Sequence, residues 1–172
     1  MIRLSRDEVL MAAAAGLARE SRFTSNPKFK GDKGNLHNAI MIHSEAVGAE
    51  IAVAKYFGIE DFHPTVNTFK NEPDIAMKSG LGLEVKQTKY PTGALIVTDD
   101  DRDTDIGVLV TGTSPTYTVV GWIPVSVAKK PKYQASDGTY WVTQQNLQPI
   151  ENLLRSVYGQ RYANNQIQMP RL

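Results

Sequence analysis

The chain contains no cysteine among its 172 residues. That absence excludes a disulfide scaffold, a thiolate zinc site and a cysteine nucleophile. An excess of one charge is also lacking, because 19 Lys and Arg offset 18 Asp and Glu. A nucleic-acid partner would therefore have to bind a local basic patch rather than a globally positive surface. Without a run of about 18 apolar residues, the sequence gives no sign of a membrane-spanning helix or a membrane partner.

The composition that is present describes a globular protein. Hydrophobic residues make up 41% and charged residues 22% of the chain, which excludes wholesale disorder. Near the start, Ser5 and Glu8 form a capping box ahead of the apolar run 9–18. The acids at Asp7 and Glu8 favour a cytoplasmic helix over a signal peptide, whose first region is basic. We therefore expect a cytoplasmic protein.

The order of patterns along the chain predicts three regions. Residues 1–36 are expected to form an N-terminal appendage, with a helix over 6–20 and a basic loop over 21–36. Residues 37–158 form the main domain, with a long helix over 37–57, a run of short strands and a closing helix over 147–158. The Gln- and Asn-rich residues 159–172 form a flexible tail. Strands are expected over 65–69, 74–77, 81–89, 94–97, 106–111, 117–122 and 140–142. Helices followed by strands predict an α+β fold with a mixed or antiparallel sheet.

One hairpin carries the most informative pattern. Two β-rich runs flank Lys78-Ser79-Gly80, and a three-residue hairpin loop places glycine at its left-handed position. That loop pairs Met77 with Leu81 and sets Asp74 opposite Glu84. Because side chains alternate along a strand, Asp74, Glu84 and Lys86 then share one face. The other face is apolar and belongs to the core, with Ile75, Met77, Leu83 and Val85.

Two carboxylates directly opposite each other destabilise a sheet unless a counterion lies between them. Mg²⁺, or Mn²⁺ in its place, suits such hard oxygen ligands. Lys86 would then be placed to orient or deprotonate a nucleophile and to offset the charge of a phosphorane-like transition state. The alternative is a solvated strand face on which Lys86 pairs with Glu72 across the hairpin.

These residues resemble the PD-(D/E)XK nuclease superfamily, which includes restriction endonucleases, phage exonucleases and Holliday-junction resolvases. The superfamily has a Glu on a helix, a Pro-Asp on one strand and a (D/E)-x-K on the next. Pro73-Asp74 and Glu84-Val85-Lys86 match the strands, and Glu50 in a G-x-E-x-A-x-A-K segment matches the helix. Residues 43–149 are also similar to small uncharacterised phage-encoded proteins.

The resemblance implies a restriction-endonuclease-like mixed central β-sheet flanked by helices. It also implies hydrolysis of DNA phosphodiesters by one or two Mg²⁺ ions, held by Asp74, Glu84, the Val85 carbonyl and Glu50. Lys86 would activate or position the attacking water. A phage or mobile-element endonuclease in the host cytoplasm fits best, with a dimeric, junction-resolving enzyme as one option. The alternatives are an exonuclease that processes DNA ends and a non-catalytic module that binds DNA or a host protein.

Other residues on the long helix compete for the site. Glu45 is the rival of Glu50, but five residues separate them by about 140°, so both cannot face one metal ion. His43, seven residues before Glu50, shares its face as a ligand or phosphate donor, although a solvated or hydrogen-bonded histidine is the ordinary reading. The histidines show no zinc spacing. The acidic run 99–105 is expected to be a solvated connection that faces away from DNA.

Several polar and basic residues are candidates for contact with nucleic acid, although surface lysines also serve solubility alone. They are Lys28, Lys30 and Lys33 in the first loop, Gln87 and Lys89 after the motif, and Lys129 and Lys130 in a later turn. Trp122 and Trp141 are expected in the core rather than as stacking platforms.

Overall fold

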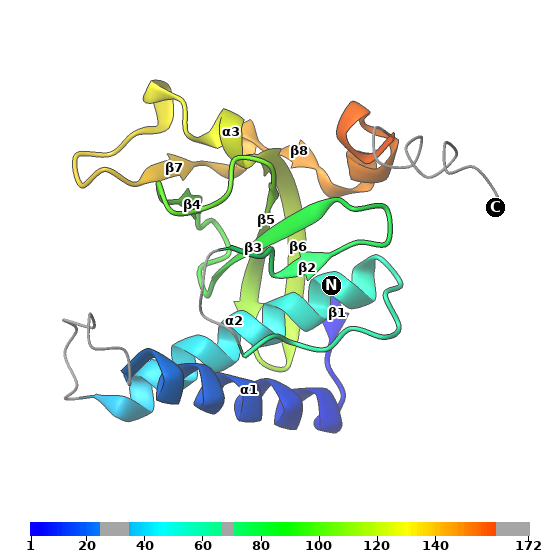
Figure 1. Ribbon diagram of the computed structural model, residues 1–172, viewed down its shortest axis with the longest axis vertical. Coiled ribbons are helices and arrows are strands. Elements are labelled where there is room, and N and C mark those ends of the chain that lie inside the picture. The colour runs from blue at the N-terminus through cyan, green and yellow to red at the C-terminus, as the bar shows by residue number, and fades with distance from the viewer. Residues whose placement is uncertain (25–34, 67–70, 161–172) are drawn as a thin grey trace.

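The computed structural model describes residues 1–24, 35–66 and 71–160. Within these residues, a mixed sheet has the strand order β1-β6-β5-β3-β2, with β8 beside β6 (Figure 1). Its strands are β1 (Ile2–Arg3), β2 (Ile75–Ala76), β3 (Gly82–Thr88), β5 (Ile106–Thr113), β6 (Thr116–Pro124) and β8 (Gln148–Pro149). Strands β3 and β5 run parallel, whereas the other neighbours in this sheet are antiparallel. The expected α+β fold with a mixed sheet flanked by helices is confirmed.

Two long helices pack together on one face of this sheet (Figure 1). They are α1 (Arg6–Thr24) and α2 (Leu36–Tyr56). The capping box is present at the start of α1, where the Ser5 amide donates to Glu8 Oε2 at 2.6 Å and the Glu8 amide to Ser5 Oγ at 3.2 Å. A Cβ added at Gly16 would lie 2.7 Å from Ser44 Cα, so glycine permits the close approach of α1 to α2. That approach fixes the position of the next turn of α1.

The N-terminal segment, expected to be an appendage, contributes to the same core as the rest of the chain. Strand β1 extends the sheet, with Ile2 opposite Tyr117 in β6. Helix α1 buries Ala12 and Ala15 in the cluster that also holds Val47. The following basic loop, with Lys28, Lys30 and Lys33, lies outside the described residues, as do residues 161–172 of the tail.

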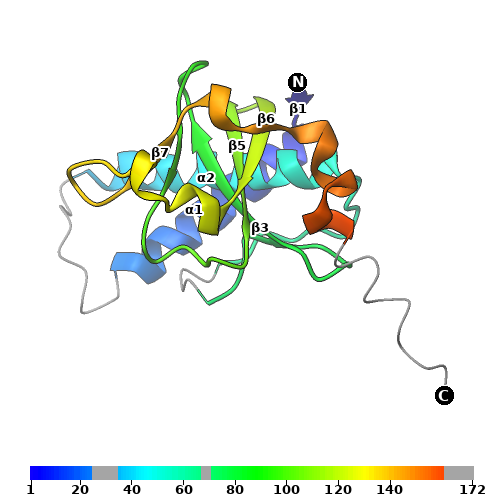
Figure 2. The same ribbon diagram turned by 90° about the horizontal axis from the view of Figure 1, so that it is seen from above.

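The opposite face of the sheet is covered by smaller elements. Strands β4 (Leu95–Val97) and β7 (Tyr140–Val142) pair antiparallel, and the short helix α3 (Val125–Ala128) lies beside them. Their buried side chains form a second cluster with Leu109 and Ile123 of the main sheet. A 3-10 turn, η1 (Pro131–Tyr133), follows α3. Figures 1 and 2 show β7 well apart from the red-orange residues 150–160.

The predicted closing helix over 147–158 is wrong. The chain instead forms the turn η2 (Gln144–Asn146), strand β8 and the 3-10 helix η3 (Ile150–Arg155). Pro149 explains the difference, because proline lacks the amide that a helix interior needs. Its carbonyl accepts a hydrogen bond from Trp122 Nε1 at 3.0 Å instead. Among the described helices, none is long and apolar enough to cross a membrane.

Two further expectations have mixed outcomes. Trp122 is buried as predicted, whereas Trp141 is 50% exposed because the central residue of the three-residue strand β7 faces outward. The strand expected over 65–69 is not formed at residues 65–66, and residues 67–70 lie outside the described part of the chain.

Candidate functional site

The hairpin has the predicted register. Ile75 lies opposite Leu83, and the Met77 amide donates to the Leu81 carbonyl at 2.9 Å. Gly80 has a φ of 90°, the left-handed conformation that the loop requires. Continued one residue beyond β2, which begins at Ile75, the same register would set Asp74 opposite Glu84. Ile75, Leu83 and Val85 are buried, and Met77 packs against their cluster, as predicted for the core-facing side of the hairpin.

Six charged side chains gather around this hairpin and form what we call the acid cluster. Its carboxylates are Glu50, Asp74, Glu84 and Asp101, and its cations are Arg19 and Lys86. Lys86 Nζ donates to Glu84 Oε1 at 2.8 Å and to Asp101 Oδ1 at 2.9 Å. Asp74 Oδ2 accepts a hydrogen bond from the Val85 amide at 2.8 Å. The lysine thus lies between two carboxylates of the cluster, rather than on Glu72 as the alternative reading expected.

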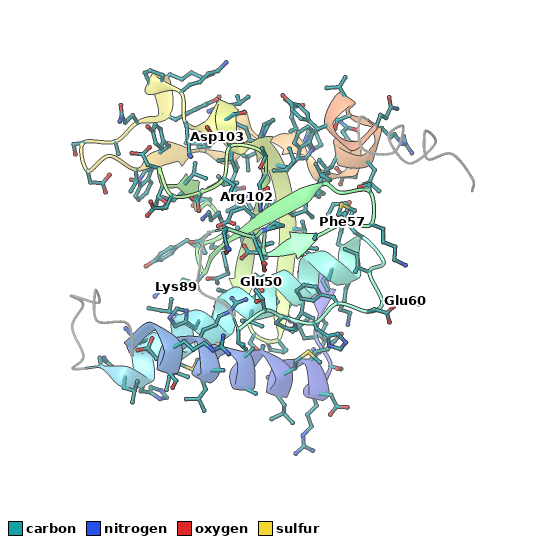
Figure 3. All side chains as sticks on the ribbon, viewed as in Figure 1. Glu50, Phe57, Glu60, Lys89, Arg102 and Asp103 are labelled. Atoms are coloured by element: carbon teal, nitrogen blue, oxygen red, sulfur yellow. The ribbon has the colours of Figure 1, made fainter. Side chains whose placement is uncertain are left out.

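Glu50 reaches the acid cluster from α2 and is only 2% exposed (Figure 3). Arg19 of α1 holds both of its oxygens, with Nη1–Oε1 at 2.6 Å and Nη2–Oε2 at 2.8 Å. Burial raises the pKa of Glu50 to about 8, against the lowering effect of the Arg19 hydrogen bond. The charges of Asp74 and Glu84 raise this pKa further, which places those carboxylates within electrostatic reach of Glu50.

The choice between Glu50 and Glu45 is decided by the direction of each side chain. Glu45 Oε2 accepts hydrogen bonds from the Ser114 amide at 2.9 Å and from Tyr117 Oη at 2.8 Å. Glu45 therefore holds the turn between β5 and β6, and Glu50 is the helix carboxylate of the cluster. His43 lies 3.2 Å from Glu20 Oε2 of α1, so its Nε2 faces the contact between the two helices.

The acidic connection 99–105 is solvated as predicted at Asp99, Asp100 and Asp103, but the prediction is wrong for Asp101, which reaches the acid cluster. Asp101 is 2% exposed, and its Oδ2 accepts from the Thr98 amide at 2.7 Å while its Oδ1 binds Lys86. Lys129 holds this loop from α3, donating to the Asp99 carbonyl at 3.0 Å and to Asp103 Oδ1 at 2.8 Å. The spacing of Thr98 and Asp101 could have predicted the turn that Asp101 stabilises. No pattern in the neighbouring sequence predicts that Asp101 also binds Lys86.

The remaining candidates for nucleic-acid contact are distributed unevenly. Gln87 Nε2 donates to the Gly112 carbonyl at 2.7 Å, which makes it a contact within the sheet. Lys129 is committed to the loop that holds Asp101, so it is not a free phosphate contact. Lys89, whose ammonium lies 5.3 Å from the centre of the Tyr90 ring, and Lys130 are exposed. These two lysines are the described basic candidates that remain accessible.

The acid cluster contains carboxylate and carbonyl oxygens, which are the ligands that a divalent cation such as Mg²⁺ prefers. Four carboxylates against two cations leave a formal excess of two negative charges. Among the described residues, no three His, Asp or Glu side chains form a ready metal-binding group. Asp74, Glu84 and the Val85 carbonyl are nevertheless enough for Mg²⁺, which typically takes one or two carboxylates and keeps several waters.

Asp105, the last residue of the acidic connection, is buried at 1% exposure, and its Oδ2 has no hydrogen-bond partner. Burial raises the pKa of Asp105, Arg102 lowers it, and the charges of Glu84 and Asp101 raise it. A raised pKa in the folded state means that stability is lost as pH rises above the unfolded value. Asp105→Asn, which removes the charge and keeps an acceptor, should therefore gain about 1 kcal/mol at pH 8.

Urea unfolding of both proteins at pH 4, 6 and 8 checks this expectation. The advantage of Asp105→Asn should grow as pH rises above the unfolded pKa, because the native carboxyl, whose pKa is raised, keeps its proton when the unfolded one has lost it. Asp100→Asn, in the exposed part of the same connection, is the matched control and should show no such gain. An advantage that does not change with pH would show that buried charge at Asp105 is not what costs stability.

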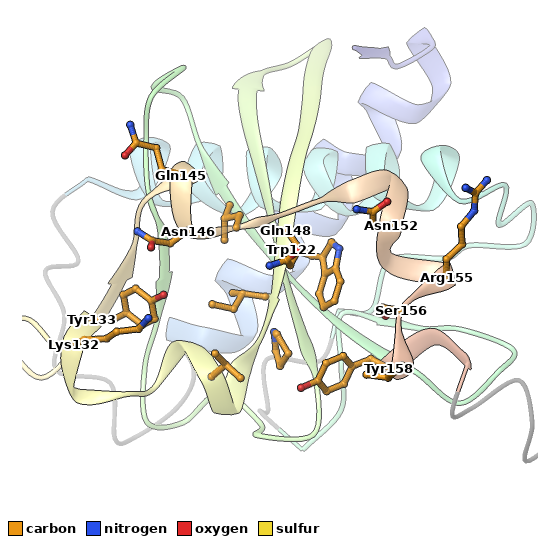
Figure 4. Close-up of a pocket in the computed structure, with 15 residues that line it drawn as sticks. Trp122, Lys132, Tyr133, Gln145, Asn146, Gln148, Asn152, Arg155, Ser156 and Tyr158 are labelled. Atoms are coloured by element: carbon orange, nitrogen blue, oxygen red, sulfur yellow. The ribbon is translucent and has the colours of Figure 1, made fainter.

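A cavity of about 700 Å³ lies between β6, η1 and η3, away from the acid cluster (Figure 4). Three aromatic side chains line it, Trp122, Tyr133 and Tyr158, together with several carboxamides from residues 145–152. None of the acid-cluster residues borders this cavity. Sequence reasoning missed it, because its lining combines β6 and η1 with residues 145–158, most of which were expected to form one helix.

Comparison with known proteins found no relative of this chain. No family model matches the chain, and searches of curated proteins and of solved structures found no match. The interpretation of the acid cluster therefore depends on its own geometry.

Proposed function

We propose that this protein is a metal-dependent nuclease that hydrolyses DNA phosphodiester bonds as an endonuclease. One observation carries the proposal. Asp74, one residue before β2, accepts from the Val85 amide at 2.8 Å beside Glu84, with Lys86 bound to Glu84 at 2.8 Å and Glu50 within electrostatic reach. Opposed carboxylates are unfavourable in a sheet by themselves. A divalent cation would offset the two excess negative charges of the acid cluster.

Each residue has a distinct role in this proposal. Asp74, Glu84 and the Val85 carbonyl would hold Mg²⁺, which supplies Lewis-acid stabilisation of the charge that develops on the phosphate. The Lys86 side chain is 19% exposed, so its ammonium can reach solvent or a bound strand. It would orient the attacking water and offset negative charge in the transition state. Asp101 also holds that ammonium, with Nζ–Oδ1 at 2.9 Å.

A non-catalytic binding module is the second candidate, and a specific observation favours it. Both cations of the acid cluster are already paired with carboxylates, Arg19 with Glu50 and Lys86 with Glu84 and Asp101. Such a closed network can serve stability or specificity of folding without any reaction. The two candidates differ in whether the cluster takes up metal and whether a nucleic acid is cut.

Cleavage of a labelled substrate panel tests the proposal. The panel holds linear duplex DNA, single-stranded DNA, a flap, a four-way junction and RNA, each incubated in Mg²⁺, Mn²⁺, Ca²⁺ or EDTA. We expect internal cuts in DNA with Mg²⁺ or Mn²⁺, none in EDTA, and none by Glu84→Gln. Lys78→Ala, in the exposed loop of the same hairpin, is the matched control and should cut like the native chain.

The outcomes separate the candidates. Cutting from the ends alone would make the protein an exonuclease, and cutting of RNA alone would change the substrate class. Binding of DNA without cutting in any metal would favour the non-catalytic module. Cutting by Glu84→Gln at the native rate would refute the acid cluster as the site.

A further inference from the structure

Arg19 is a buried cation that the proposed reaction does not use. It is 7% exposed and comes from α1, far in sequence from the hairpin and the acidic loop. Its guanidinium bonds both oxygens of Glu50, and its Nε donates to the Thr65 carbonyl at 2.8 Å. These three hydrogen bonds fix the orientation of the Arg19 guanidinium, which faces the acid cluster.

The charge of Arg19 is permanent under any working condition. Burial lowers the pKa of its guanidinium, but the hydrogen bond to Glu50 and the charges of Glu50, Asp74 and Glu84 raise it overall. Arginine does not lose its proton in proteins, and its planar fork matches a carboxylate. The cluster thus contains a fixed positive charge within electrostatic reach of all three proposed site carboxylates.

We propose that Arg19 takes the place of a second divalent ion, so that the acid cluster binds one metal ion and not two. This inference rests on the proposed function, because it concerns the same carboxylates. Paired metal ions in phosphodiesterases lie about 4 Å apart and share a dense set of ligands. Here both oxygens of Glu50 are engaged by Arg19, so an ion would be held by Asp74, which also accepts from the Val85 amide, and Glu84, which also binds Lys86.

The packing of the helices supports this assignment. Gly16 lies one turn before Arg19, and its lack of a side chain lets α1 approach Ser44 of α2 closely. Arg19 is therefore delivered by a rigid contact between two helices rather than by a loose loop. The N-terminal helix would then be part of the site, because it supplies one of the cations that offset the four carboxylates.

Counting bound Mn²⁺ tests the inference without reference to activity. Titration calorimetry, with electron paramagnetic resonance of free Mn²⁺ as a second readout, gives ions per chain. We expect one ion in the native protein, two in Arg19→Met, and one in Arg19→Met/Glu50→Gln, which removes both charges of the pair. Arg19→Lys keeps a positive charge at this position and should bind one Mn²⁺ ion per chain. Arg22→Met, on the exposed side of α1, is the control and should also bind one.

Each result decides the inference. Two ions in the native protein would overturn it and leave the nuclease proposal intact. If Arg19→Met and the native protein each bind one Mn²⁺ ion, Arg19 does not determine how many metal ions the acid cluster binds. No ion in the native protein would contradict the metal site and the proposed function together. If Arg19→Met does not fold, the native and Arg19→Lys counts still test it, since two ions in either would refute it.

Discussion

Replacing Arg19 by Met is expected to lower the free energy of unfolding by about 3–5 kcal/mol in EDTA at pH 9, because breaking a buried ion pair leaves a charge without a partner. Glu50 would keep its buried position among Asp74 and Glu84, with no cation on its oxygens. The loss should be smaller at pH 6, where Glu50 can take up a proton and become neutral, since its pKa is already raised to about 8.

Urea denaturation of four proteins measures this effect. The double variant Arg19→Met/Glu50→Gln should recover most of the loss, because replacing both partners of a buried pair is often nearly neutral. Arg22→Met changes an exposed arginine of the same helix and should shift stability by no more than about 0.5 kcal/mol. If the single and double variants were equally unstable, the loss would reflect packing around residue 19 rather than the charge left on Glu50.

Features set by local rules were predictable from the sequence. The register of the hairpin follows from a glycine at one loop position and from the alternation of apolar residues on either side of it. The long helix over 37–57 follows from its apolar stripe, and the observed α2 spans Leu36–Tyr56. Both predictions depend on residues close together in sequence, so tertiary structure had little opportunity to override them.

The partners of the site residues were not predictable in the same way. Arg19 and Glu50 are 31 residues apart, and Lys86 and Asp101 are 15 apart. The spacing of residues in the sequence does not predict which arginine or aspartate will pair with a given charge. That depends on how the helices pack and on where each loop lies in the folded protein. The acidic run 99–105 shows what composition alone does not predict. Composition indicated a solvated loop, whereas Lys86 and Lys129 bury part of it.

The proposed role of Lys86 leads to the second large effect. Lys86→Met should lower kcat for DNA cleavage by about 10²–10⁴-fold, the range for loss of a residue that handles a proton in the transition state. Uptake of Mg²⁺ should persist, because Asp74 and Glu84 remain, and Mg²⁺ should still raise the melting temperature by mass action. Glu84→Gln should lose both cleavage and that rise. Comparing the two variants separates a lysine that acts on the reaction from a carboxylate that holds the metal.

Asp101→Asn completes this series, because in the proposed mechanism Asp101 would act only through Lys86. The Asn side chain keeps an acceptor for Lys86 Nζ and loses the charge, so we expect a fall in kcat of about 10–100-fold with KM little changed. A purely structural role would lower the melting temperature without changing the pH dependence of kcat in the folded fraction. A positioning role predicts a changed pH profile, since the carboxylate that stabilises the Lys86 ammonium has been removed. Native kcat and pH profile in this variant would exclude Asp101 from the function and leave Glu84 as the carboxylate that orients the lysine.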